Sequence, residues 1–117
     1  MKIQSIKSHP QVDVTLDGAR GARMRMLIGP EDGARNFHMR HFEVSAGGCT
    51  PHHSHDYEHE LLVLKGEGVA VSLQGERPFK AGDVIFIPAN EHHQLVNRSG
   101  APCELICLIP APQDCCR

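Results

Sequence analysis

The residues most able to do chemistry in this chain are its histidines, of which there are nine among 117 residues. Six of them fall between positions 52 and 93, in two short clusters. The first cluster contains His53, His55 and His59, and the second contains His93. Neutral imidazole is a good ligand for zinc, copper, iron and nickel. The two clusters therefore indicate a metal-binding site.

Strand geometry selects which histidines can meet at one ion. Side chains alternate between the two faces of a strand, so His53 and His55 point the same way while His52 points oppositely. For the same reason His93 and His92 lie on opposite faces of their strand. We therefore expect His52 and His92 to lie outside the site.

The apolar neighbours indicate which face is turned inward. His59 has the parity of Leu61 and Val63, and His93 has the parity of Leu95. If these apolar residues face the core, both histidines do. Three inward histidines from one segment and a fourth from a distant strand predict a single four-imidazole site. The alternative is a set of surface histidines in polar turns, which is the commoner situation for one histidine but not for four in phase.

The elements that must position these residues are short strands. Apolar and polar residues alternate in brief runs that end at glycine, proline or other turn residues. The runs cover residues 24–28, 37–44, 61–64, 69–73, 84–87, 92–97 and 103–109. This spacing predicts an all-β protein, an antiparallel sandwich or barrel. The segment from Gly18 to Arg35 is loop-rich outside the first run, and we expect it to wrap an outer edge or to exchange with a neighbouring molecule.

The order of the glycines and histidines resembles the two sequence motifs of the cupin superfamily. The first is Gly47, five residues, His53-Ser54-His55, three residues, His59, six residues and Gly66. The second is Gly82, five residues, Pro88-Ala89-Asn90, two residues, His93, three residues and Asn97. His59 replaces the usual glutamate and Asn90 the usual glycine, a place where asparagine tolerates left-handed backbone angles.

The resemblance implies a cupin jelly-roll barrel, an antiparallel double-stranded β-helix, as a single domain over residues 1–117. Its core would cover about 36–110, with N-terminal strands and a wrapping loop in 1–35 and a frayed tail in 111–117. It also implies that His53, His55, His59 and His93 are metal ligands, as in small single-domain bacterial cupins with four histidine ligands. Some of these carry manganese. We expect one divalent transition metal ion, manganese or iron first, with copper, nickel or zinc as alternatives.

Two further side chains are candidate catalytic residues of the pocket. Arg40 is in phase with Phe42, and if both face inward the guanidinium needs a carboxylate partner from the protein or a substrate. The alternative is an arginine at the exposed end of its strand. On the last strand, placing Glu104 outward puts Cys107 inside, where a cysteine is more often a packing residue than a nucleophile. The expected apolar walls of the pocket are Leu95, Leu105, Cys107 and Ile109.

Carboxylates near the histidines are candidate acceptors for imidazole N–H groups. They are Glu58, Glu60 and Glu91. Solvated charges at the rim of the barrel are the alternative for at least two of them.

Three functions are compatible with such a site. The first, which we expect, is an oxygenase or dioxygenase-like enzyme acting on a small organic substrate that chelates the metal through oxygen. The second is an isomerase or lyase in which the ion only polarises a carbonyl. The third is a non-catalytic module that binds a small ligand. A tetrahedral zinc ion with four histidines would have no open position and would favour a structural role.

Composition excludes several other classes. The formal net charge of −2 offers no electrostatic footprint for nucleic acid or an anionic membrane. No run approaches the roughly 18–20 apolar residues of a membrane span, and the first residues lack the apolar core of a secretion signal. We therefore expect a cytoplasmic protein with five free thiols, including Cys115 and Cys116 in the tail.

One apolar face is expected to lie outside the barrel. With Leu61 inward, Leu62 and Leu64 face outward, together with Ile85 or Phe86 on another strand. Such a cluster on a small domain marks an interface. We expect a symmetric homodimer, the commonest closed assembly.

Overall fold

The computed structural model describes residues 1–112, so the last five residues of the predicted tail, including Cys115 and Cys116, lie outside the described part. Two 3₁₀ turns occur, η1 (Ile6–Ser8) and η2 (Pro30–Asp32). The strands are β1 (Val12–Asp13), β2 (Arg20–Ile28), β3 (Phe37–Cys49), β4 (His59–Lys65), β5 (Glu67–Ser72), β6 (Gly75–Lys80), β7 (Val84–Ile87), β8 (His93–Val96) and β9 (Cys103–Pro110). No helix in residues 1–112 is long and apolar enough to cross a membrane.

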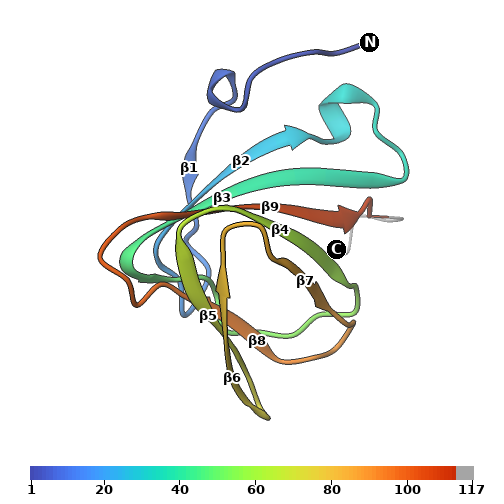
Figure 1. Cartoon of the computed structure of the whole chain (residues 1–117). Coiled ribbons are helices and arrows are strands. Elements are labelled where there is room, and N and C mark those ends of the chain that lie inside the picture. The colour runs from blue at the N-terminus through green and yellow to red at the C-terminus, as the bar shows by residue number, and fades with distance from the viewer. Residues whose placement is uncertain (113–117) are drawn as a thin grey trace.

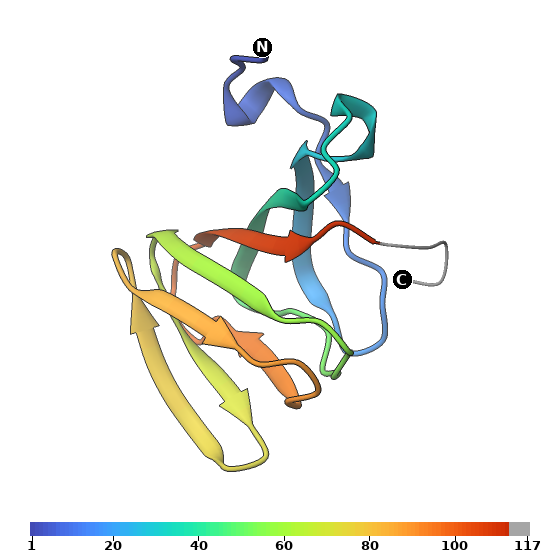
Figure 2. The ribbon, with the colours of Figure 1, turned by 90° about the vertical axis from the view of Figure 1, so that its right-hand side faces the viewer.

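All strands belong to one antiparallel sheet, whose main path runs β6-β5-β8-β3-β9-β4-β7. β2 pairs with β3 outside this path, and β1 pairs with β2. Figures 1 and 2 show that the sheet curls on itself, so that β4 and β7 lie across from β8 and β5 and enclose an interior. The prediction of an all-β antiparallel barrel is confirmed.

β3 is the hub of this curl. Its first part pairs with β2 and β9, and its end pairs with β8 through Cys49 and Val96. The sequence predicts that this strand ends before Gly47, but the ladder continues because the Gly47 N–H donates to the Asn97 carbonyl at 2.8 Å. Gly48 is required there, since a Cβ would lie 2.5 Å from the Arg20 carbonyl oxygen.

Two strands differ from the sequence-based expectation. β2 extends over nine residues inside the segment predicted to be loop-rich, because it pairs with β3 along most of its length. β6 was not predicted at all. It forms a hairpin with β5, and only its Phe79 is buried, so its sequence shows no apolar alternation.

The inner face of the sheet forms the core. Its buried residues are Ala22, Val44, Leu61, Val63, Phe79, Ile87, Leu95, Cys103, Leu105 and Cys107. Asn97, the last residue of the second motif, is fully buried beside this core. Its amide donates to the carbonyls of Val44 at 2.9 Å and Ala101 at 2.8 Å, which joins the ends of β3, β8 and β9.

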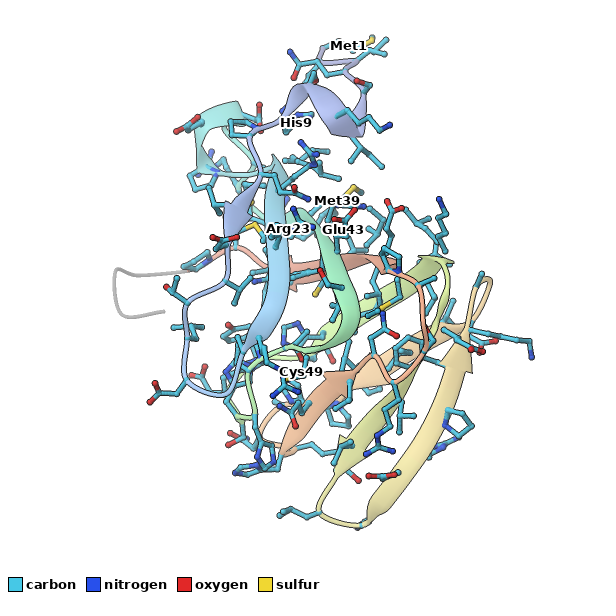
Figure 3. The ribbon with its side chains drawn as sticks, turned by 90° about the vertical axis from the view of Figure 1, so that its left-hand side faces the viewer. Met1, His9, Arg23, Met39, Glu43 and Cys49 are labelled. Atoms are coloured by element: carbon cyan, nitrogen blue, oxygen red, sulfur yellow. The ribbon has the colours of Figure 1, made fainter. Side chains whose placement is uncertain are left out.

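The outer face of the same strands is different in character. Arg23 and Glu43 form a cross-strand ion pair of 2.8 Å on β2 and β3, on the side that Figure 3 presents. On β4 and β7 the outer face is apolar: Leu62 is 41% exposed, Leu64 41% and Phe86 58%. Ile85, the alternative to Phe86 in the sequence prediction, instead packs against the core.

Candidate metal centre

Backbone hydrogen bonds hold the loop between β3 and β4 against the start of β8. The His53 N–H donates to the His93 carbonyl at 3.2 Å, and the His93 N–H donates to the His53 carbonyl at 3.0 Å. The Thr50 N–H donates to the Leu95 carbonyl at 2.9 Å, one step further along β8. Two histidine-bearing segments that are distant in sequence are therefore joined directly.

The turn before β8 completes this connection. The Asn90 N–H donates to the His55 carbonyl at 2.6 Å, and Asn90 has a φ of 68°. This left-handed conformation is the one expected where asparagine replaces the glycine of the motif. The turn thus fixes the backbone of His55 as well as the entry into His93.

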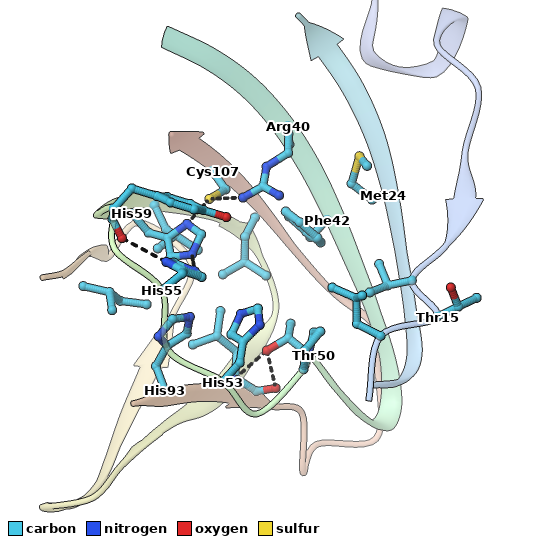
Figure 4. A pocket seen from close by; sticks show the side chains of 18 of the residues that line it. Thr15, Met24, Arg40, Phe42, Thr50, His53, His55, His59, His93 and Cys107 are labelled. Carbon is cyan, nitrogen blue, oxygen red and sulfur yellow. Dashed lines mark hydrogen bonds between the residues drawn. The ribbon is translucent and has the colours of Figure 1, made fainter. Parts of the chain in front are cut away.

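The structure brings together the four histidines that the sequence predicts as ligands. One ring nitrogen from each of His53, His55, His59 and His93 lies within 4.8 Å of the other three. The Nε2 atoms of His55 and His59 are 2.7 Å apart, and the rings converge on one end of the interior (Figure 4). His52 and His92 lie outside the cluster and contact each other edge to face, with 5.0 Å between ring centroids.

At three of the four histidines the other ring nitrogen has a partner that turns the ring inward. The Nδ1–H of His55 donates to the Tyr57 carbonyl at 2.9 Å, and that of His93 donates to the Glu91 carbonyl at 2.9 Å. The Nδ1 atom of His59 lies 3.1 Å from the sulfur of Cys107. The sequence suggested carboxylates for this role, but the side chains of Glu58, Glu60 and Glu91 are exposed, and backbone carbonyls within two residues reach the rings instead.

Burial keeps these histidines neutral. Desolvation lowers the pKa of His53 to about 4 and that of His59 to about 3, with the positive charge of Arg40 adding to the shift at His59. The pKa values of His55 and His93 are also lowered, chiefly by burial. Four neutral imidazoles with convergent nitrogens are the donor set that a divalent transition metal takes, so the residues fit such an ion.

A cavity of about 280 Å³ opens from the histidines into the barrel. Leu95, Leu105 and Cys107 line it as predicted, whereas Ile109 packs against the core instead. Residues 12–16 also line the cavity. No sequence pattern marks these residues as pocket-lining, since their position depends on two β1–β2 pairs rather than on any pattern within the segment.

Arg40 lies in this cavity, as its parity with Phe42 predicts. Its Nη2 atom donates to the Cys107 sulfur at 3.4 Å, and its guanidinium lies 5.0 Å from the centroid of the Phe42 ring. Among residues 1–112 no carboxylate forms an ion pair with it. Burial raises the pKa of the Cys107 thiol, so this side chain is a neutral thiol near pH 7 rather than a nucleophilic thiolate.

Comparison with known proteins gives consistent matches. The family model for the cupin domain matches residues 40–109. The structure of the polyketide cyclase RemF from Streptomyces resistomycificus superposes with a TM-score of 0.91 and 36% identity, covering 96% of this chain and 80% of that one.

Two curated proteins are similar in sequence. An oxalate-binding protein from Thermotoga maritima is 29% identical over 93% of both chains. A 1-methylthio-D-xylulose 5-phosphate methylsulfurylase from Rhodospirillum rubrum is 28% identical over 65% of this chain. This chain spans about half the length of that methylsulfurylase, since the match covers 49% of it.

Proposed function

Because the chain belongs to the cupin domain family, we propose that it is a metal-dependent enzyme acting on a small organic substrate that binds through oxygen atoms. The observation that carries the proposal is the cluster of four neutral, convergent imidazoles at the end of a largely apolar cavity that also holds Arg40. A bound divalent ion would act as a Lewis acid toward a carbonyl or enol oxygen of the substrate.

Arg40 supplies the second positive charge of the site. It is the only lysine or arginine among the described residues that line the cavity, and its contacts are a thiol and an aromatic ring rather than a carboxylate. A half-buried guanidinium without an anionic partner favours a substrate with a carboxylate or with charge that develops as an enolate. The apolar walls exclude water and strengthen that attraction.

The size of the cavity limits the substrate. A volume of about 280 Å³ lies just below the range of about 300–1,000 Å³ that small-molecule sites span. Phe42, Leu95 and Leu105 provide flat or aliphatic walls. The site therefore suits a compound of one or two rings, or a short chain that folds into one, with oxygen atoms at one end.

We favour non-oxidative carbonyl chemistry for this enzyme. Its support is the similarity to the polyketide cyclase RemF, at 36% identity over nearly the whole chain. In such a step an enolised carbon forms a carbon–carbon bond to a carbonyl carbon of the same molecule, and the new alkoxide takes up one proton. The new carbon–carbon bond closes the ring, loss of one water then leaves a carbon–carbon double bond in it, and no oxidant is consumed. Arg40 would stabilise the enolate that precedes bond formation.

The test is turnover of a short poly-β-ketoester by protein loaded separately with zinc, manganese or iron, under air and under nitrogen. We expect a product lighter than the substrate by one water, formed equally in both atmospheres. Protein carrying His93→Ala should form it no faster than buffer containing the free ion. Equal rates for the intact protein and that buffer would contradict the proposal.

Oxygenase chemistry is the second candidate. The all-nitrogen donor set favours it, because imidazole suits iron and copper, which react with dioxygen. Oxygen uptake that is stoichiometric with substrate loss, and absent under nitrogen, would replace the cyclase proposal with this one.

The identity of the metal is part of the proposal. We place manganese or iron first, on the resemblance to four-histidine cupins, and copper, nickel or zinc second. Metal analysis of protein purified without a histidine tag decides between them.

A further role of Arg40 is testable by binding alone. Replacing Arg40 with methionine removes the charge but keeps an unbranched side chain. Charge-assisted hydrogen bonds contribute about 1.5–3 kcal/mol, so an anionic oxygen chelator such as tropolonate should bind the loaded variant about 10- to 100-fold more weakly. Met24→Leu, on the same cavity wall, is the control and should leave its Kd unchanged.

We also propose that the chain forms a homodimer through the outer apolar face of β4 and β7. Leu62, Leu64 and Phe86 are the exposed apolar side chains that support it, together with Val84, which is 79% exposed. Contiguous apolar side chains of this kind are uncommon on monomeric proteins of this size.

A further inference from the structure

Three of the four histidines have a hydrogen-bond partner at Nδ1, and the partners are of two kinds. At His55 and His93 it is a backbone carbonyl, 2.9 Å away in each case. A carbonyl only accepts, so each of these rings carries its proton on Nδ1 and presents Nε2 to the cavity. At His59 the neighbour of Nδ1 is a side chain, the Cys107 sulfur at 3.1 Å.

The strand register explains how the sulfur reaches this ring. β9 lies between β3 and β4, and Cys107 is directly opposite Arg40 on one side and Leu61 on the other. His59 precedes Leu61 by two residues and so lies on the same face, diagonal to Cys107. Both side chains are buried, Cys107 at 2% exposure and His59 at 7%.

The Cys107 sulfur has nitrogen atoms of Arg40 and His59 as neighbours, and its own S–H group faces a carbonyl acceptor. The Arg40 Nη2–H donates to it at 3.4 Å, while the Leu108 carbonyl lies 4.0 Å away as the acceptor for the S–H group. Figure 4 shows the Cys107 sulfur between the Arg40 guanidinium and the His59 ring, in contact with both.

From this geometry we propose that Cys107 is a positioning residue for His59: its sulfur accepts the Nδ1–H, fixes that tautomer and aims Nε2 at the metal. The inference rests on the proposed metal site. At His55 and His93 a backbone carbonyl has this role, and no side-chain substitution removes a carbonyl. At His59 the partner is a side chain, so a mutation can remove it. Such partners typically change metal affinity by about 10- to 100-fold.

The competing interpretation is that Cys107 only fills space in the core. Cys103 separates the two, because it is on the same strand and face, is 1% exposed and lies in the same core cluster. Within residues 1–112 its sulfur has no hydrogen bond to a histidine ring of the kind that Cys107 makes. Loss of either thiol leaves a small cavity and lowers stability. Only loss of Cys107 would change the metal site.

The experiment compares Cys107→Ala, Cys107→Ser and Cys103→Ala with the unmodified chain. Zinc is the probe, and its Kd is measured by competition with a chromophoric chelator. We expect Cys107→Ala to raise the Kd at least tenfold. Cys107→Ser should stay within about threefold, because a hydroxyl still accepts the N–H, and Cys103→Ala should stay within the same limit. Melting temperatures of the metal-free proteins should fall similarly for both alanine variants.

A second readout reports the tautomer itself. In zinc-loaded protein with ¹⁵N-labelled histidine, NMR should show a slowly exchanging Nδ1–H for His59, which Cys107→Ala makes fast-exchanging and Cys107→Ser retains. Equal zinc affinity of Cys107→Ala and Cys103→Ala, or a spectrum with Nδ1 of His59 on the metal, would overturn the inference while leaving the metal site intact. Failure of the unmodified chain to bind zinc would overturn both the site and the inference.

Discussion

The two faces of β4 differ sharply although their residues alternate along one strand. The inner face carries His59, which contacts the cavity, followed by the core residues Leu61 and Val63. The outer face carries Leu62 and Leu64, which are apolar and exposed. The strand therefore places one polar, reactive group inside the barrel and two apolar side chains on its outer surface, where polar side chains are the usual arrangement.

The difference shows where each face obtains its stability. The inner polar groups are neutral because burial lowers the pKa values of His53 and His59. The rings of His55 and His93 are in addition hydrogen-bonded to backbone carbonyls. A neutral, satisfied imidazole costs much less to bury than a charged one. The outer apolar groups stay exposed on a single chain, and we propose that a second copy covers them.

The largest expected effect comes from the inner face. Alanine in place of His53, His55, His59 or His93 should lower bound metal to below about a tenth of one ion per chain, because each removes one of four donors. His52→Ala and His92→Ala should retain full content, although each is adjacent to a member of the cluster. Metal content is measured by mass spectrometry after dialysis.

The contrast between the two faces would be contradicted if the face on which a histidine lies did not decide whether it binds the metal. Near-full occupancy after loss of His59 would reduce the site to three histidines. Metal loss in His52→Ala equal to that in His53→Ala would mean that position along the chain, rather than the face of the strand, decides ligation.

Parity and motif spacing are the reasons why the sequence predicted so much of this site. The same alternation that places Leu61 inside places His59 there, and the inward position of Arg40 followed from Phe42. Contacts between side chains on different strands could not be predicted from the sequence, because the register depends on which strands pair rather than on any one strand. Thus Cys107 was placed in the barrel, but its contacts with Arg40 and His59 were not foreseen.

The same limit explains what was missed in the fold. β6 presents polar residues to water on both faces apart from Phe79, so no hydrophobic pattern marks it. The wall formed by residues 12–16 depends on β1 pairing with β2 through two residue pairs. Carbonyl acceptors at the histidines are equally invisible in a sequence, since every residue has a carbonyl.

The next effect concerns the outer face. Leu62→Glu places a charge in the apolar patch and should convert a dimer of twice 12.9 kDa into a monomer at micromolar concentration, with metal content unchanged. Leu73→Glu, at a site that is 80% exposed beyond β5, is the matched control and should remain a dimer. Sedimentation equilibrium measures both. If the unmodified chain sediments with the mass of a single copy, the proposed dimer is wrong.

The smallest expected effect is the dependence of stability on pH in metal-free protein. The pKa values of His53, about 4, and His59, about 3, lie below the unfolded value of about 6.5, so the unfolded chain binds more protons in between. Stability should therefore be constant with respect to these groups above pH 6.5 and fall as the pH drops toward 4. Arg40 faces the histidines from β3 and strengthens the trend, whereas Cys107 on β9 is neutral in this range.

His59→Gln, which removes one titrating group at similar size, should flatten the decline in melting temperature between pH 6.5 and 4, while the exposed His52→Gln should not. Equal slopes for the two variants would mean that the inner histidines are not held neutral by burial, and the contrast between the two faces would lose its electrostatic basis.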